Sequence, residues 1–479
     1  MPEKRVPSRV ANRALMMGTV VALLLLCLLV VAGCGGGGPL KTTTTTSTAA
    51  AAFTQLLPVV QRTATRVGDA NCTKCHAADH TTWMATKHAA ALVDCESCHG
   101  PGSVHIKSPT AANILSGVNS TSNVVCAQCH SAENSDWSAS KHAQIVADPV
   151  NAASGTCYRC HSGEFRATYV DSPLAHGQTP AQADTTIVAL STATLQSYTT
   201  TTHSSATCTN CHDPHQNTTN LTSAGEQFYL RRATSSTDLS SDLPGATAAS
   251  YTTVNQICGS CHNNRGGDPS DAGLTKNTSR PATHEGPEYN MLLGNGGAED
   301  AAGPPTRIAS HGSAPDQCVQ CHMPNSRHTF TVSLDTSCSP CHTSADAAAR
   351  ESSVQNEIQN DLVALRTRMQ NWAQTTFKDP AVWDYTTNIV SPSKAPNQSL
   401  VPIQIKRARH NYYFILLDRS LGVHNTAYTR YLINYANTGL DALGISRVAV
   451  KPLSKQAAIP ILNEDIFKVR TANSHPTDL

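Results

Sequence analysis

A helical period of apolar residues appears in the C-terminal part of the chain, after residue 342. Apolar side chains recur there at three- and four-residue intervals, which predicts an amphipathic helix ending near Asp379-Pro380. The positions are Val354, Ile358, Leu362, Leu365, Met369 and Trp372. Two further helices are expected over residues 403–417 and 425–443, with Tyr412, Tyr413 and Phe414 in a core. The last thirty or so residues show no clear period, so we expect a docked tail.

The N-terminal segment has the pattern of an export signal. A basic cluster precedes the apolar run 14–32, as in a secretory leader. The run is also long enough to span a bilayer, so an uncleaved membrane anchor is the alternative. Val31-Ala32-Gly33-Cys34 resembles the bacterial lipobox, where cleavage before the cysteine leaves its thiol free to carry lipid. We predict a lipoprotein signal peptide over residues 1–33, lipidation of Cys34 and a lipid-anchored low-complexity tether over 34–66.

The composition is poor in the residues that usually build a core. Of 479 residues, 5% are aromatic and 14% are charged, and the long intervals 161–208 and 262–318 are rich in Gly, Pro, Asn and Ser. Such a chain has difficulty burying enough apolar surface by itself. It therefore needs another source of buried apolar surface.

One motif, Cys-x-x-Cys-His, occurs eight times, and the group that it binds supplies this buried apolar surface. The eight copies are Cys72-Thr-Lys-Cys75-His76, Cys95-Glu-Ser-Cys98-His99, Cys126-Ala-Gln-Cys129-His130, Cys157-Tyr-Arg-Cys160-His161, Cys208-Thr-Asn-Cys211-His212, Cys258-Gly-Ser-Cys261-His262, Cys318-Val-Gln-Cys321-His322 and Cys338-Ser-Pro-Cys341-His342. Two thiols bind the porphyrin vinyl groups in c-type haem, and the adjacent imidazole binds the iron. Zinc sites or redox dithiols are the alternatives for a CxxC pair, but neither requires the following histidine.

Eight covalently attached haems (haem c) are therefore predicted, each with a proximal histidine from its own motif. Flat apolar porphyrins supply the buried surface that the side chains lack. The motifs use 16 of the 18 cysteines, and the other two, Cys27 and Cys34, lie in the leader region, so no structural disulfide is expected. Haem propionates make the loaded protein acidic, which disfavours nucleic acid as a partner.

Thirteen of the 21 histidines lie outside the motifs and are candidates for the second axial position. Methionine, the usual alternative, is scarce. The probable distal ligands are His88, His105, His142, His215, His284, His311 and His328. The candidates for the eighth place are His176, His203 and His424, while His80, His410 and His475 are expected at the surface. Two of these assignments come from a duplication, in which tryptophan and histidine follow His76 and His130 at equal spacings, as Trp83 and His88 and as Trp137 and His142.

These patterns resemble multihaem (octahaem) c-type cytochromes, in particular the outer-membrane lipoprotein cytochromes of dissimilatory metal-reducing bacteria. The resemblance rests on the segments 95–105, 318–330 and 422–425. The last two are also similar to pentahaem nitrite reductases and their octahaem relatives, whose C-terminal helices pack at subunit interfaces. The chain departs from the nitrite reductases because it has no CxxCK motif for a lysine-ligated catalytic haem.

The resemblance implies a mainly α-helical fold with extensive irregular loops around eight haems. It implies an octahaem cytochrome c domain over residues 67–345 and a C-terminal helical region and tail over 346–479. The leading hypothesis is an electron-transfer protein with no catalytic residue. It is expected to be exported and lipid-anchored at the outer membrane, on the periplasmic face or the cell surface.

The partners expected from this resemblance are other redox proteins of a respiratory chain and extracellular metal oxides or other terminal acceptors. A lipid anchor implies contact with the membrane, and the C-terminal helices imply an oligomer. The alternative is a multihaem reductase of nitrite, hydroxylamine, tetrathionate or a similar small oxyanion. That enzyme requires one iron with an open distal site.

Overall fold

The computed structural model describes residues 45–116, 122–144, 155–175, 177–198, 206–231, 257–264, 267–275, 286–384, 400–447 and 453–473. The chain divides into two units, Met1–Ala52 and Phe53–Leu479, and the second holds every CxxCH motif. The leader, including Cys27 and Cys34, lies outside the described residues. Among the helices that are described, none combines the length and the apolar character needed to cross a membrane.

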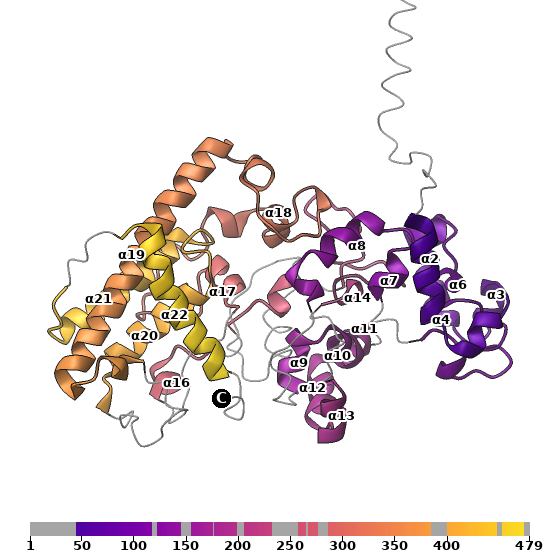
Figure 1. Cartoon of the computed structure of the whole chain (residues 1–479), viewed down its shortest axis with the longest axis horizontal. Helices are drawn as coiled ribbons and strands as arrows, with labels where there is room; N and C mark the ends of the chain where they lie inside the picture. The colour runs from indigo at the N-terminus through magenta and orange to yellow at the C-terminus, as the bar shows by residue number, and fades with distance from the viewer. Residues whose placement is uncertain are drawn as a thin grey trace, which may run out of the picture. The chain divides into compact units, whose positions relative to one another are not determined.

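Short helices and turns form the part of the chain that carries the motifs (Figure 1). The α-helices are α2 (Thr45–Leu56), α3 (Asp69–Cys72), α4 (Ala77–Trp83), α5 (Lys87–Ala90), α6 (Cys95–His99), α7 (Ser122–Cys126), α8 (Ser131–Ser138), α9 (Gly155–His161), α10 (Gly163–Arg166), α11 (Ser172–Ala175), α12 (Pro180–Val188), α13 (Thr192–Ser197), α14 (Cys208–Cys211), α16 (Asp271–Thr275), α17 (Glu288–Leu293) and α18 (Cys318–His322). The 3₁₀ or π turns are η1 (Val59–Thr63), η2 (Ala111–Asn113), η4 (Lys141–Ala143), η6 (Ala167–Asp171), η7 (Cys258–Ser260), η8 (Ser310–Ser313), η9 (Pro324–Ser326) and η10 (Leu334–Cys338).

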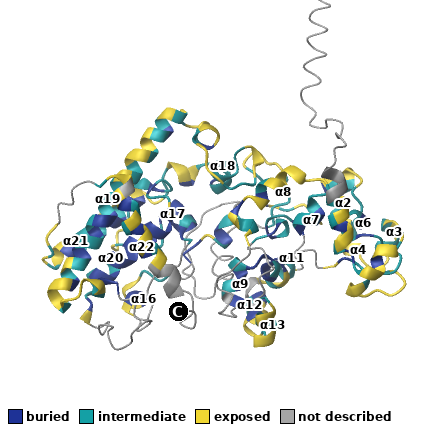
Figure 2. Ribbon diagram, viewed as in Figure 1, coloured by how far each residue is buried: buried dark blue, intermediate teal, exposed yellow. Residues whose placement is uncertain are grey.

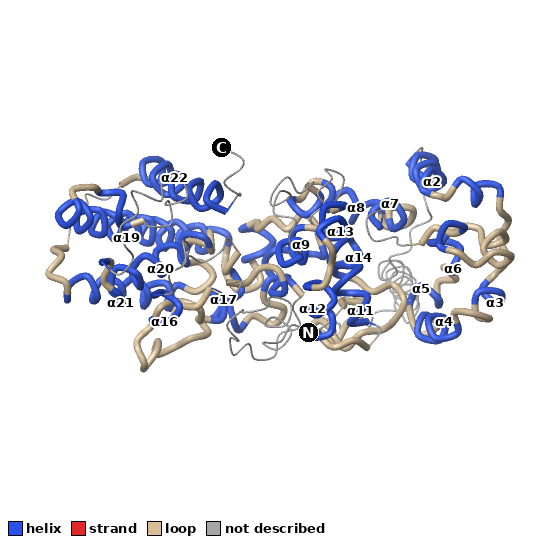
Figure 3. The backbone as a smooth tube through the Cα atoms, turned by 90° about the horizontal axis from the view of Figure 1, so that it is seen from below, coloured by secondary structure: helices blue, strands red, loops and turns tan. Residues whose placement is uncertain are grey.

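The described residues contain no strand longer than an isolated bridge, and Figure 3 accordingly shows helices joined by loops. The two bridges join Leu230 to His212 and to Asn220. The expectation of a mainly helical chain with extensive loops therefore holds for the described residues. Side-chain caps begin several of the short helices, as where Thr86 accepts a hydrogen bond from the Ala89 amide of α5.

The C-terminal helices are longer and pack around one hydrophobic core. They are α19 (Ser344–Phe377), α20 (Ile403–Leu417), α21 (Thr426–Ala442) and α22 (Lys455–Asn473), with η11 (Pro380–Trp383) after α19. Helix α20 has the bounds that the periodicity predicts, and α21 differs from its expected range by one residue at each end. Tyr412, Tyr413 and Phe414 are fully buried in this core, which Figure 2 shows as the dark faces of the helices.

Helix α22 replaces the tail without period that the sequence suggests. Its Leu462 packs into the core, and its buried Asp465 accepts a hydrogen bond from Arg366 of α19 at 2.6 Å. The Tyr412 hydroxyl donates to the same carboxylate at 2.7 Å. Because Pro460 lies inside the helix and the apolar positions are few, docking onto α19 and α20 stabilises it more than its own pattern does.

The C-terminal helices also pack directly against the segment 286–298, which belongs to the expected haem domain. The side chain of Asn411 forms two hydrogen bonds with the backbone of Ala298, at 2.7 and 2.9 Å. A Cβ atom on Gly297 would lie only 2.4 Å from a Leu432 methyl, so the close approach of loop and helix requires glycine there. The two parts expected on either side of residue 345 thus belong to one compact unit.

Candidate haem-ligand site

Each CxxCH motif folds as one helical turn or a closely related turn. In the first motif the His76 amide donates to the Cys72 carbonyl at 2.9 Å, and the His342 amide donates to the Cys338 carbonyl at 2.8 Å. Residues i, i+3 and i+4 share one face of a helix. The two thiols and the imidazole of a motif therefore face the same side, as attachment of one porphyrin requires.

Seven of the eight motif histidines lie opposite a histidine from elsewhere in the chain. The ring centroids are 6.4 Å apart for His76 and His105, 6.0 Å for His99 and His215, 6.2 Å for His130 and His88, 6.2 Å for His212 and His328, 6.2 Å for His262 and His142, 6.3 Å for His322 and His424, and 6.4 Å for His342 and His311. Each pair joins one motif histidine with one other histidine.

These separations match two imidazoles on opposite sides of one metal ion. An imidazole nitrogen binds a first-row metal at about 2.0–2.1 Å and lies about 1.1 Å from its ring centroid, so two trans rings have centroids about 6.3 Å apart. The seven observed distances run from 6.0 to 6.4 Å. The residues present therefore fit an iron with two imidazole ligands.

Hydrogen bonds engage Nδ1 of many of these rings, so that Nε2 is the nitrogen left for a metal. Nδ1 of His99 lies 2.8 Å from the Leu115 carbonyl, and Nδ1 of His311 lies 2.7 Å from the Val423 carbonyl. Since a carbonyl accepts, Nδ1 carries the proton and donates it, which leaves Nε2 as the free electron pair. Equivalent Nδ1 contacts are those of His105 with Thr110, His212 with Phe228, His322 with Phe330 and His328 with Ser326.

Two histidines that have no motif histidine opposite them behave differently. His410 is buried, with 1% of its surface exposed, and its Nε2 lies 2.9 Å from the Gly296 carbonyl. The expectation that His410 lies at the surface is therefore wrong; packing of α20 against the 286–298 segment buries it. The ring of His80 is tilted against that of Trp83, with 5.6 Å between the centroids, and both residues belong to α4.

The histidines expected as distal ligands are thus placed as follows. His88, His105, His142, His215, His311 and His328 each lie opposite a motif histidine, and so does His424, one of the three candidates for the eighth place. His176, His203, His284 and His475 lie outside the described residues. The candidates that remain for the position opposite His161 are therefore among these four histidines.

The duplicated histidines pair with distant motifs and not with their neighbours. His88 lies opposite His130, and His142 lies opposite His262, although each follows a different motif closely in sequence. Each duplicated histidine therefore lies opposite a motif other than the one that it follows in sequence.

Burial keeps several of these imidazoles neutral, the form that binds metal. It lowers the pKa of His142 to about 4, and it does the same for His212 despite the hydrogen bond to Phe228. Two rings beside carboxylates differ. Burial lowers the pKa of His262, but Glu288 together with Cys261 and Cys258 raises it to about 9. Burial also lowers the pKa of His424, but Asp418 and Glu288 raise it above its ordinary value.

The loop that carries His424 is held against α19. Gly422 has φ +91°, and a Cβ atom there would lie 2.9 Å from Ile358 Cγ1, so glycine is required for both reasons. Arg419 and Leu421 also have positive φ, which is unusual for such residues. Tertiary packing therefore imposes this backbone path, and it places His424 opposite His322.

Thiols of different motifs lie close together, and these contacts show which motifs are neighbours in space. Sulfur atoms of Cys72 and Cys95 lie with an Asp69 oxygen in a group spanning no more than 4.8 Å. Cys126 likewise lies beside Cys208, Cys160 beside Cys261, and Cys258 beside Cys318. Cys98 is near Cys129, Cys211 near Cys258, and Cys321 near Cys338.

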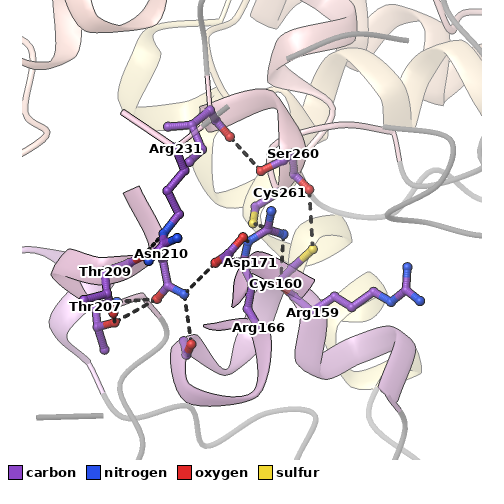
Figure 4. Close-up of polar contacts among 12 residues, drawn as sticks. Arg159, Cys160, Arg166, Asp171, Thr207, Thr209, Asn210, Arg231, Ser260 and Cys261 are labelled. Atoms are coloured by element: carbon purple, nitrogen blue, oxygen red, sulfur yellow. Dashed lines mark hydrogen bonds and ion pairs between the residues drawn. The ribbon is translucent and has the colours of Figure 1, made fainter. Parts of the chain in front are cut away.

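If the motifs are numbered along the chain, these contacts place them next to one another in the order one, two, three, five, six, seven and eight. The fourth motif lies beside the sixth. The junction of the fourth, fifth and sixth motifs is drawn in Figure 4. There the Cys160 thiol lies 3.9 Å from the Ser260 carbonyl, and Arg166 Nη1 lies 3.7 Å from the Cys261 sulfur.

Buried polar contacts hold that junction together. Arg166 and Asp171 form an ion pair at 3.3 Å, and Asn210, inside the fifth motif, donates to Asp171 at 3.2 Å and to the Gly163 carbonyl at 2.9 Å (Figure 4). Both charged side chains are about 96% buried or more. Because removal of either partner would leave the other charge buried without its counter-charge, these contacts favour the arrangement in which the motifs meet here.

The arrangement of the described cysteines does not favour the zinc alternative. All 16 motif cysteines are present as thiols. The described part of the chain contains one group of three close metal-binding side chains, Asp69, Cys72 and Cys95, and its two cysteines come from different motifs. A structural zinc site normally has four ligands, with both thiols of one CxxC pair among them.

Comparisons with known proteins place the chain only coarsely. No protein-family model matches it, and no curated protein does so. Among solved structures it is similar to one described as the crystal structure of outer cell wall cytochrome OcwA, with 18% sequence identity over 73% of this chain and 70% of that chain and a TM-score of 0.45. The histidine and cysteine geometry, rather than this likeness, carries the proposal below.

Proposed function

We propose that the protein is a multihaem c-type cytochrome that carries electrons along a series of covalently bound haems. The observation that carries the proposal is the set of seven histidine pairs, each joining a CxxCH histidine to a histidine outside the motifs at 6.0–6.4 Å. Haem iron, when bound, supplies reversible one-electron exchange between its ferric and ferrous states.

The chain's own residues would do three things in this role. The motif cysteines would attach each porphyrin, and the motif histidine and its opposite histidine would hold the iron between them, which would keep small substrates from it. Backbone carbonyls on Nδ1 hold the rings in one tautomer and orientation. The close thiols of successive motifs keep neighbouring haems near one another.

The order of neighbouring motifs supports a branched route. Electrons would pass through the first, second, third, fifth, sixth, seventh and eighth haems, and the fourth would exchange with the sixth at the Arg166 junction. Such a route has three ends, each of which is a candidate contact for a redox partner. Other respiratory redox proteins and extracellular acceptors fit this role by chemistry.

The location is proposed from the leader pattern alone. An exported chain with lipid on Cys34 would be held stably at a membrane, since two acyl signals or more give stable anchoring; the choice of the outer membrane follows the resemblance to outer-membrane lipoprotein cytochromes. Mass spectrometry of the mature protein should find a diacylglycerol on Cys34. A mature chain that still begins with residues 1–33 would contradict this part of the proposal.

The spin states of the irons test the proposed function. Electron paramagnetic resonance of the oxidised holoprotein should show low-spin haem only. Replacing His328 by Ala should leave eight haems attached and convert one iron per chain to the high-spin form, because His212 then lacks its opposite ring. The matched control, His80→Ala, should change nothing, since the His80 ring lies near Trp83 and the bond from the His80 amide to the His76 carbonyl is kept by alanine.

Two results would overturn the proposal. A purified chain without covalent haem would exclude a c-type cytochrome. A native high-spin signal amounting to one haem per chain would replace the carrier by a reductase with an open iron.

A further inference from the structure

Asp418 has a buried carboxylate that lies behind one of the paired histidines. Asp418 ends helix α20 and has 1% of its surface exposed, and its Oδ1 lies 2.7 Å from Nδ1 of His424. His424 in turn lies opposite His322 of the seventh motif. The buried carboxylate therefore accepts a hydrogen bond from a ring whose other nitrogen faces the iron position.

Ser420 holds this carboxylate in its orientation. The Ser420 hydroxyl donates to Asp418 Oδ2, its amide lies 3.3 Å from the same oxygen, and its Oγ accepts the His424 amide at 3.1 Å. Asp418, Ser420 and His424 thus form a small closed network in the loop between α20 and α21. The carboxylate cannot turn away from the ring without breaking these bonds.

The other described groups near Nδ1 of the paired histidines are neutral, more exposed or farther away. Carboxylate oxygens of Asp79, Glu133 and Asp213 lie 3.6, 3.9 and 4.0 Å from Nδ1 of His76, His130 and His215, beyond hydrogen-bond distance. His212, His311, His322 and His328 donate to neutral backbone carbonyls. Asp346 accepts from His342 at 3.2 Å, but its side chain is 43% exposed and it is shared with Arg350. Glu288 lies 3.4 Å from His262 with 26% of its side chain exposed, whereas the side chain of Asp418 is fully buried.

A carboxylate that accepts the Nδ1 proton makes the imidazole a stronger donor through Nε2. Burial strengthens the effect, because little water screens the charge. A stronger axial donor and a nearby negative charge both stabilise ferric over ferrous iron, which lowers the reduction potential.

We propose that Asp418 is a positioning residue that lowers the reduction potential of the iron between His322 and His424. The haem of the seventh motif is then a low-potential step between those of the sixth and eighth motifs. This inference rests on the proposed function. The couple is Fe(III) plus one electron giving Fe(II), no bond to the ligands breaks, and no proton moves.

The test is a redox titration of the full holoprotein carrying Asp418→Asn, with dithionite as the reductant. Asparagine keeps the size of the side chain and removes its charge. One of the eight couples should shift upward by about tenfold in its oxidised-to-reduced equilibrium, which is about 59 mV for one electron. One low-spin paramagnetic signal should change its g values, and the other couples should stay in place.

The matched control is Asp346→Asn, which removes the exposed carboxylate behind His342. It should shift its couple by much less, because solvent and Arg350 already screen that charge. Ser420→Ala provides a second test, since it loosens the carboxylate without removing the charge. It should produce a smaller upward shift of the same couple. If Asp418→Asn does not fold, the redox titration of Ser420→Ala tests the role of Asp418.

The outcomes separate this inference from the proposed function. A folded Asp418→Asn protein with eight low-spin haems and unchanged couples would overturn the role of Asp418 and leave the electron carrier standing. A shift no larger than that of Asp346→Asn would overturn it as well. Absence of covalent haem from the wild-type protein would overturn both.

Discussion

The motif-bearing region and the C-terminal helices are stabilised in different ways. Between Phe53 and His342 the described residues form three small hydrophobic clusters, with two to four buried residues each. The core around α19, α20, α21 and α22 contains 24. In the motif-bearing region, the α-helices that follow Cys72 contain four to nine residues. The four long C-terminal helices contain 15 to 34 residues.

The difference shows where a cofactor would replace side chains in the core. Helices shorter than about 12 residues are marginal in water without tertiary packing, and small clusters supply little of it. Porphyrins would supply the missing apolar surface in the motif-bearing region. The C-terminal helices bury their own side chains and need no such addition.

The largest effect should follow from removing haem attachment altogether. In a full chain with alanine at all 16 motif cysteines, the region between Phe53 and His342 should lose its fold while the C-terminal helices persist. Limited trypsin digestion with mass spectrometry should find cleavage throughout the first region, including Lys74 and Arg159. Arg368 and Arg409, which are at most 1% exposed, should stay uncut.

The holoprotein is the reference for that digestion, and both of its regions should resist. If fragments of the motif-bearing region from the alanine chain resisted trypsin as well as those of the C-terminal helices, the contrast drawn here would fail.

A core truncation should produce an intermediate effect confined to the second region. Leu365→Ala removes a side chain that is 1% exposed in the α19 core and should cost about 2–5 kcal/mol. Denaturation followed by far-UV circular dichroism should show the loss, while the Soret band of the folded protein stays unchanged. Leu92→Ala is the control, because Leu92 is 89% exposed and should cost almost nothing. Equal losses from the two variants would argue against a separate C-terminal core.

The smallest effect should come from helix caps, and it should differ between the regions. Thr86 caps the four-residue helix α5, which carries His88, and Thr343 caps the 34-residue helix α19. Loss of either cap costs about 0.5–2 kcal/mol. Hydrogen exchange should show all of α5 opening in Thr86→Ala, but only the first turn of α19 opening in Thr343→Ala. Fraying of equal extent would show that α5 does not depend on its cap.

Local sequence patterns predicted some elements closely and missed others. The amphipathic period after residue 342 corresponds to α19, and the expected 403–417 helix corresponds to α20. Helix α22 was missed because its stability comes from Leu462 and Asp465 docking on other helices, which no period along the segment records. His410 was misplaced for a similar reason, since the Gly296 loop that buries it lies far away in sequence.

The sequence predicted least well which histidine lies opposite each motif histidine. Local motifs marked His88 and His142 as candidates, but not that they lie opposite His130 and His262. The preference for His284 over His424 also came from local sequence. His424 lies opposite His322 because the loop containing Gly422 packs against α19.

By itself, the sequence determined which residues can attach haem. A CxxCH motif closes within one helical turn, so its two thiols and imidazole share a face whatever surrounds them. Tertiary structure alone decided which histidine lies opposite each of seven motif histidines, which motifs are neighbours, and that Asp418 is buried behind His424. These features depend on packing between segments far apart in the chain, and the local alternation of residue types carries no record of that packing.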